Sequence, residues 1–159
     1  MENKAGNDNY TVACRNILRY ERAAVEIYEL AAHLLDSDLG EPDYQKLLEA
    51  HRSQLDVIGS FLTERDQQIE AAEWGWDRPR SAVLSAATIY GAESPVRQLL
   101  DQEQEILAYY ETVLESRATC EELRQRVAEE LLPRAKGILA TLQPDTGAKE
   151  VAFAERASA

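Results

Sequence analysis

Residues 17–31, ILRYERAAVEIYELA, and residues 99–114, LLDQEQEILAYYETVL, decide the fold. In each stretch apolar and aromatic side chains recur at alternating steps of three and four, which is the spacing of one buried face of an α-helix. A single glutamate interrupts each face and a tyrosine follows it seven residues later, as Glu21 with Tyr28 and as Glu103 with Tyr110. Because a buried ionised carboxylate is costly unless other groups compensate it, each of these helices requires a partner for its glutamate.

Outward from these stretches, the pattern predicts four long helices. Runs of Ala, Leu, Glu, Gln and Arg favour helix, and 7 Gly and 5 Pro among 159 residues are too few turn residues for an all-β fold. We expect helices over residues 10–35, 42–70 and 94–116. A fourth helix is expected to begin at a capping box formed by Thr119 and Glu122.

The predicted architecture is all-α: a ferritin-like, antiparallel four-helix bundle over residues 10–143, with one long crossover between the second and third helices. Residues 1–9 are expected to be a disordered N-terminus and residues 144–159 a flexible C-terminal tail. The crossover is expected to carry a short extra helix, and Trp74 and Trp76 to anchor it against the bundle.

The two cysteines, Cys14 and Cys120, lack the spacing of a metal site and are expected to be reduced thiols. In the predicted bundle the first helix runs parallel to the third and antiparallel to the fourth. The cysteines would then lie at opposite ends, roughly 25 Å or more apart, given the rise of a helix per residue. A disulfide cannot span that separation.

Acidic residues outnumber basic ones, which gives a formal net charge of −12 and a pI of about 4.6. This charge argues against binding to nucleic acid or to an anionic membrane surface. The N-terminus has no secretory signal, and no apolar run approaches the ~20 residues that span a membrane. We therefore expect a cytoplasmic protein. Apolar residues at the ends of such a bundle are compatible with a homodimer.

The glutamate–tyrosine pairs on the first and third helices, together with His51 on the second, resemble the ferritin-like superfamily. Within it, the chain looks like small bacterial four-helix-bundle members that are domains of unknown function. The resemblance covers residues 10–143 and includes the WGW segment at 74–76 and the IYGAESP turn at 89–95. In ferritin-like di-iron proteins two helices each supply one glutamate, and the other two each supply a Glu-x-x-His motif.

Carried onto this chain, the resemblance implies a partial site that could hold Fe, Mn or Zn. Glu21 and Glu103 match the two single glutamates, and His51 could act as an end ligand. The candidate metal ligands are thus Glu21, His51, Glu103 and Glu130, with Gln54, Tyr28 and Tyr110 around them.

Two histidines of the full pattern are missing. Gln54 stands three residues after His51, and Pro133 stands three residues after Glu130, where it is also expected to distort the fourth helix. The other histidine of the chain, His33, lies about 18 Å along the first helix from the glutamate and is out of reach.

The same residues could instead form a buried polar network with Arg52, Arg134 and the two tyrosine hydroxyls. Our leading hypothesis is a non-catalytic ferritin-like bundle with a degenerate carboxylate and histidine core, without catalytic residues. One alternative is a metal-binding oxidoreductase or metal-storage protein with an atypical site. Another is a helical interaction or assembly module that docks on a partner through its C-terminal tail.

Overall fold

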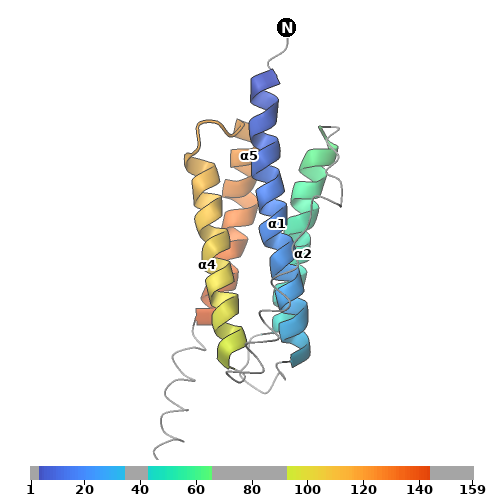
Figure 1. Ribbon diagram of the computed structural model, residues 1–159, viewed down its shortest axis with the longest axis vertical. Coiled ribbons are helices and arrows are strands. Elements are labelled where there is room, and N and C mark those ends of the chain that lie inside the picture. The colour runs from blue at the N-terminus through green and yellow to red at the C-terminus, as the bar shows by residue number, and fades with distance from the viewer. Residues whose placement is uncertain (1–3, 35–42, 66–92, 144–159) are drawn as a thin grey trace, which may run out of the picture.

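The computed structural model describes residues 4–34, 43–65 and 93–143. Its elements are α1 (Lys4–Leu34), α2 (Tyr44–Thr63), α4 (Glu93–Glu115), α5 (Glu121–Arg126) and a π-helical turn, η2 (Val127–Leu131). Residues 132–143 continue as α-helix, so residues 121–143 form one rod, here called the fourth rod. The predicted all-α class is confirmed, and the described residues contain four helical rods and no strand (Figure 1).

The four rods enclose one core. α1 packs against α2 and against α4, and η2 packs against α4. Ion pairs connect α2 to the fourth rod at one end, with Arg65 at 3.5 Å from Glu122 and Arg126 at 3.6 Å from Glu64. The centre is filled by apolar side chains without exposed surface, among them Ile17, Ile58, Leu99, Ile106, Leu123 and Leu131.

The directions of the rods differ from the predicted ones. In Figure 1, α1 and the fourth rod run downward, whereas α2 and α4 run upward. α1 is therefore antiparallel to α4, and the prediction that the first and third helices are parallel is wrong. The reason is that α2 ends at the opposite end of the bundle from the one where α4 begins. As a consequence Cys14 and Cys120 lie near the same end, not at opposite ends as predicted.

Helix boundaries differ as well. α1 already begins at Lys4, so residues 4–9 are helical where we predicted disorder, because adding residues to an existing helix costs little. The side chain of Asp43 caps α2 by accepting a hydrogen bond from the Lys46 backbone N–H at 3.1 Å. α2 ends at Thr63, and a tight turn follows in which the Arg65 N–H bonds the Leu62 carbonyl.

The start of the fourth rod corrects the predicted capping box. The N-cap of α5 is Cys120, whose backbone is extended, and no side chain caps it. Thr119 precedes the N-cap by one residue and is buried. Further along, the Leu132 N–H bonds the Val127 carbonyl in a π-turn. This wider turn comes just before Pro133, whose ring would crowd a carbonyl in a regular α-helix.

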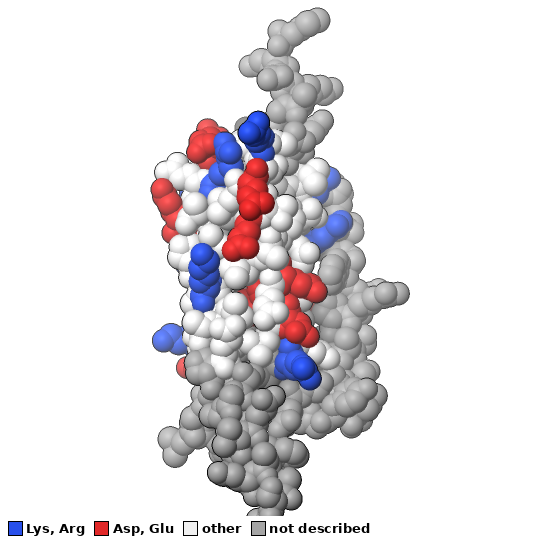
Figure 2. Space-filling view, turned by 90° about the vertical axis from the view of Figure 1, so that its left-hand side faces the viewer, with Lys and Arg blue, Asp and Glu red and all other residues white. Residues whose placement is uncertain are grey.

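Several expected features concern residues outside the described ranges. They are the short crossover helix, the packing of Trp74 and Trp76, and the tail at residues 144–159. On the face shown in Figure 2, described acidic and basic side chains are interspersed. None of the described helices combines the length and hydropathy needed to cross a membrane.

Candidate functional site

The middle of the bundle holds a cluster of polar side chains without exposed surface. Glu21 lies on α1, His51 and Gln54 lie on α2, and Glu103 lies on α4. Each occupies a position of its helix that faces the core. Tyr28 of α1 and Tyr110 of α4 are equally buried and complete the cluster. The predicted site residues on three of the four rods therefore do come together.

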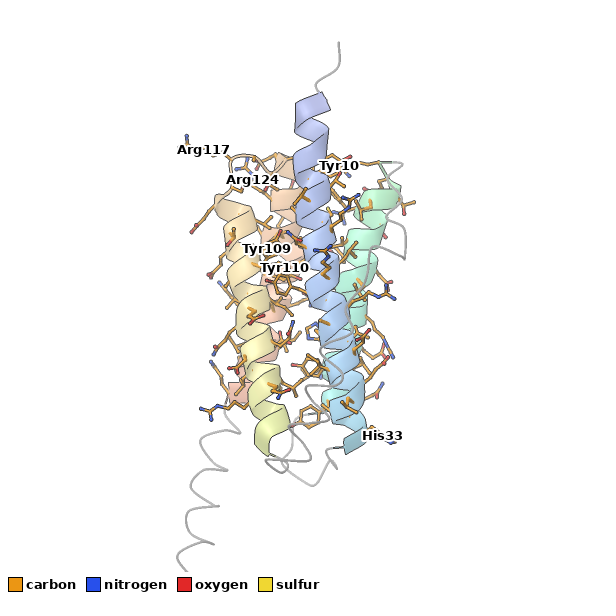
Figure 3. The ribbon with its side chains drawn as sticks, in the orientation of Figure 1. Tyr10, His33, Tyr109, Tyr110, Arg117 and Arg124 are labelled. Carbon is orange, nitrogen blue, oxygen red and sulfur yellow. The ribbon has the colours of Figure 1, made fainter. Side chains whose placement is uncertain are left out.

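The antiparallel packing of α1 and α4 decides which of these groups meet. A seven-residue step spans about two turns, or roughly 10 Å along a helix. When the two helices run in opposite directions, the tyrosine of one comes level with the glutamate of the other. The Tyr110 hydroxyl accordingly donates a hydrogen bond to Glu21 Oε1. Figure 3 shows Tyr110 midway along the bundle, far from His33 near the lower end of α1.

His51 joins the two carboxylates. Its Nδ1 lies 2.7 Å from Glu21 Oε2, and its Nε2 lies 2.8 Å from Glu103 Oε1. The first contact is a hydrogen bond. The second is as short but poorly aligned, so it is an ion-pair contact rather than a well-formed hydrogen bond. The imidazole ring thus stands between the two glutamates.

These contacts fix the protonation of the histidine. A nitrogen lone pair facing a carboxylate oxygen at under 3 Å is repulsive, so both ring nitrogens need a proton, and a neutral imidazole carries only one. Burial lowers the pKa of His51, but the short contacts with Glu103 and Glu21 and their negative charges outweigh it and raise this pKa to about 10. Both carboxylates therefore favour the imidazolium form of His51, whose positive charge would compensate theirs.

Glu21 is the well-bonded half of the site. In addition to the hydrogen bond with His51, Glu21 Oε2 accepts a hydrogen bond from Gln54 Nε2 at 3.1 Å. Its other oxygen accepts from Tyr110. Burial, the charge of Glu21 and this hydrogen bond raise the pKa of Tyr110 well above its usual value, so the phenol keeps its proton. Hydrogen bonds to an ionised carboxylate are about twice as strong as neutral ones, which suits a buried charge.

Glu103 is the poorly bonded half. Within the described residues, neither of its oxygens accepts a well-formed hydrogen bond, and the Tyr28 hydroxyl, although near Glu103, is not aligned for one either. Burial and the nearby charge of Glu103 raise the pKa of Tyr28 well above its usual value. The Tyr28 ring packs on the His51 ring, with centroids 4.8 Å apart. Tyr28 therefore contributes to the site mainly through ring packing.

Other predicted participants lie outside the cluster. Glu130 is 36% exposed and pairs with Arg126 at 3.1 Å, so it does not converge with the other candidate ligands. Arg52 pairs on the surface with Glu29 and Glu49, and Arg134 donates to the Ser53 hydroxyl. Neither arginine joins the buried network.

Gln54 plays a more direct part than predicted, since it contacts Glu21 itself. Its position three residues after His51, on the same face of α2, is the sequence signal for that role.

The residues present do not fit a metal. Within residues 4–34, 43–65 and 93–143, no group of three or more His, Cys, Asp and Glu side chains is arranged to hold a metal ion. Glu21 and Glu103 lie at opposite edges of the His51 ring, so the two carboxylates contact different ring nitrogens and do not converge on one point. On the fourth rod, the buried side chains around the predicted ligand position are Val127 and Leu131.

Comparisons with protein-family models, with curated proteins and with solved structures found no match to this chain.

Proposed function

We propose that this protein is a ferritin-like four-helix bundle in which a protonated histidine takes the place of the metal, and that its role is structural rather than catalytic. The observation that carries the proposal is the position of His51 between Glu21 and Glu103, at 2.7 and 2.8 Å. In ferritin-like metal sites, cations neutralise carboxylates in the bundle core. Here one imidazolium does so from within the chain.

Two further observations support this role. Glu130, the fourth candidate ligand, pairs with Arg126 at the surface. The fourth rod turns Val127 and Leu131 into the core, where a metal site would need a carboxylate and a histidine. Among the described residues, apolar side chains close the core on one side and the internal ion pair closes it on the other, which leaves no open coordination position for a substrate.

Metal analysis combined with NMR tests the proposal. The protein is purified without chelator, and ¹⁵N spectra of the imidazole rings are recorded before and after addition of Fe(II), Mn(II) or Zn(II). We expect metal well below one equivalent and a His51 signal with both nitrogens protonated, unchanged by added metal. The exposed His33, the only other histidine, provides the internal reference.

The metal-binding alternative predicts the opposite. Iron, manganese or zinc would be retained at one equivalent or more, and the metal would be lost in a Glu21→Gln/Glu103→Gln double variant. His51 would then show an unprotonated, metal-bound nitrogen. That result would overturn the proposed structural role.

A further inference from the structure

The end of the bundle at which α1 begins contains both cysteines of the chain, and both are free thiols. Cys14 of α1 has no exposed surface, whereas Cys120, at the N-cap of α5, is partly exposed. Both side chains pack against the same hydrophobic core. This region lies away from the buried glutamates, so the inference does not depend on the proposed function.

A series of contacts through Arg65 connects the surroundings of the two thiols. Tyr10 lies one turn before Cys14, and its ring packs edge-on against Phe61 with centroids 6.1 Å apart. The Arg65 guanidinium lies over the same Phe61 ring, 3.7 Å from its centroid. Arg65 also pairs at 3.5 Å with Glu122, two residues after the other cysteine. Contacts from three helices thus meet around Arg65, near the turns that carry the two thiols.

The electrostatics of Cys14 agree with this arrangement. Burial raises the pKa of Cys14 to about 12, the charge of Cys120 adds to this increase, and the charge of Arg65 opposes it. Since Coulomb interactions weaken with distance, Cys120 and Arg65 are near enough to the buried thiol to affect its pKa. This raised pKa keeps Cys14 in the protonated thiol form at neutral pH, so Cys14 is the less reactive of the two thiols.

We propose that Cys14 and Cys120 form a reversible intramolecular disulfide that joins α1 to the start of α5 when the protein meets a small-molecule disulfide such as oxidised glutathione. In the first step the partly exposed Cys120 thiolate attacks one sulfur of glutathione disulfide, forming a mixed disulfide and releasing one glutathione thiolate. In the second step Cys14 loses its proton and attacks Cys120 Sγ, which releases the second glutathione thiolate. Two protein thiols are oxidised and one glutathione disulfide is reduced to two thiols.

The bond would constrain the unfolded chain strongly, since it closes a long loop between residues 14 and 120. Oxidation should therefore raise the urea midpoint of unfolding, and a dithiol reductant should restore the original midpoint. The contacts of His51 should be unaffected, because that residue lies about midway along the bundle.

The test is to incubate the full-length protein with oxidised glutathione and to measure free thiols, intact mass and the cysteine-containing peptides. We expect both thiols to disappear, the monomer mass to fall by two hydrogen atoms, and a peptide linking Cys14 to Cys120. A Cys14→Ala variant should stop at a glutathione adduct on Cys120. A Cys120→Ser variant should keep its buried thiol unmodified.

The reaction of the wild-type protein with oxidised glutathione tests the proposal by itself, even if the variants do not fold. A stable glutathione adduct on wild-type Cys120 with a free Cys14 would overturn the proposal, because it would mean that the helices hold the two Cα atoms beyond the ~7 Å that a disulfide can bridge. Disulfides between two molecules, or no reaction at either thiol, would overturn it equally.

Discussion

The two halves of the buried site, one around Glu21 and the other around Glu103, look alike in sequence and differ in structure. Each glutamate sits in a helical seam with a tyrosine seven residues later. In the fold, Glu21 accepts hydrogen bonds from His51, Gln54 and Tyr110, whereas Glu103 has one poorly aligned contact with His51. The difference teaches that equal motifs need not contribute equally to stability.

The cause is the position of α2. It packs closely along α1 and directs two donors, His51 and Gln54, toward Glu21. Glu103 on α4 faces the far edge of the same imidazole and accepts no well-formed hydrogen bond within the described residues. One helix therefore satisfies one carboxylate fully and the other in part. If hydrogen bonding governs the two halves, substitutions in them should differ in their effects on stability.

The largest expected contrast is between Glu21→Gln and Glu103→Gln. Glutamine at position 21 would present an amide to three donors that now share a charged acceptor, so we expect a loss of about 3 kcal/mol or more in unfolding free energy. The same change at Glu103 leaves the His51–Glu21 pair intact and removes an excess buried charge, so we expect a loss within about 1 kcal/mol. Urea denaturation of the matched variants measures both. Equal losses would mean that the two carboxylates contribute alike.

A second contrast is the pH dependence created by His51. Its pKa is about 10 in the folded protein against 6.5 for the ordinary side chain, so between these values the folded state holds a proton that the unfolded state has released. The stabilisation is complete below pH 6.5 and is lost as pH rises through 10. Over this range we expect the unfolding free energy to fall by up to about 1.4 kcal/mol per pH unit.

The matched control for this pH dependence is His51→Gln, which keeps a polar side chain but cannot hold the proton. Urea midpoints of both proteins are compared from about pH 6.5 to about pH 9, so that other titrating groups cancel in the difference. The variant should show a much shallower decline. Parallel curves would show that His51 is neutral in the folded protein.

The smallest contrast is between the two tyrosine hydroxyls. Tyr110→Phe removes a donor from buried Glu21, and we expect a loss of about 1–3 kcal/mol. Tyr28→Phe removes a hydroxyl that makes no well-formed hydrogen bond among the described residues and keeps the ring against His51, so a change under about 0.5 kcal/mol is expected. Thermal and urea unfolding of the pair provide the measurement. A larger loss at position 28 would reverse the ranking of the two halves.

Much of the fold could be predicted because helical periodicity is local. The spacing around Glu21 and Glu103 is enough to place both side chains in the core. The sequence also places His51 and Gln54 near the glutamates, and both are buried, but it does not show which glutamate Gln54 contacts, because that depends on which helix lies opposite. The prediction that Glu130 joins the buried cluster rested on motif matching alone. In the structure Glu130 pairs with Arg126, and the buried side chains next to it on the fourth rod, Val127 and Leu131, are apolar.

By itself the sequence determined that this chain forms long helices and that two glutamates, one histidine and two tyrosines are buried among them, because each helix has one apolar face. Tertiary structure alone decided which of these residues meet. The opposite directions of α1 and α4 bring Tyr110 to Glu21, and the directions of α1 and the fourth rod put Cys14 and Cys120 at one end of the bundle. Helix direction depends on which ends of the bundle the connections join, and no local pattern of side chains encodes that.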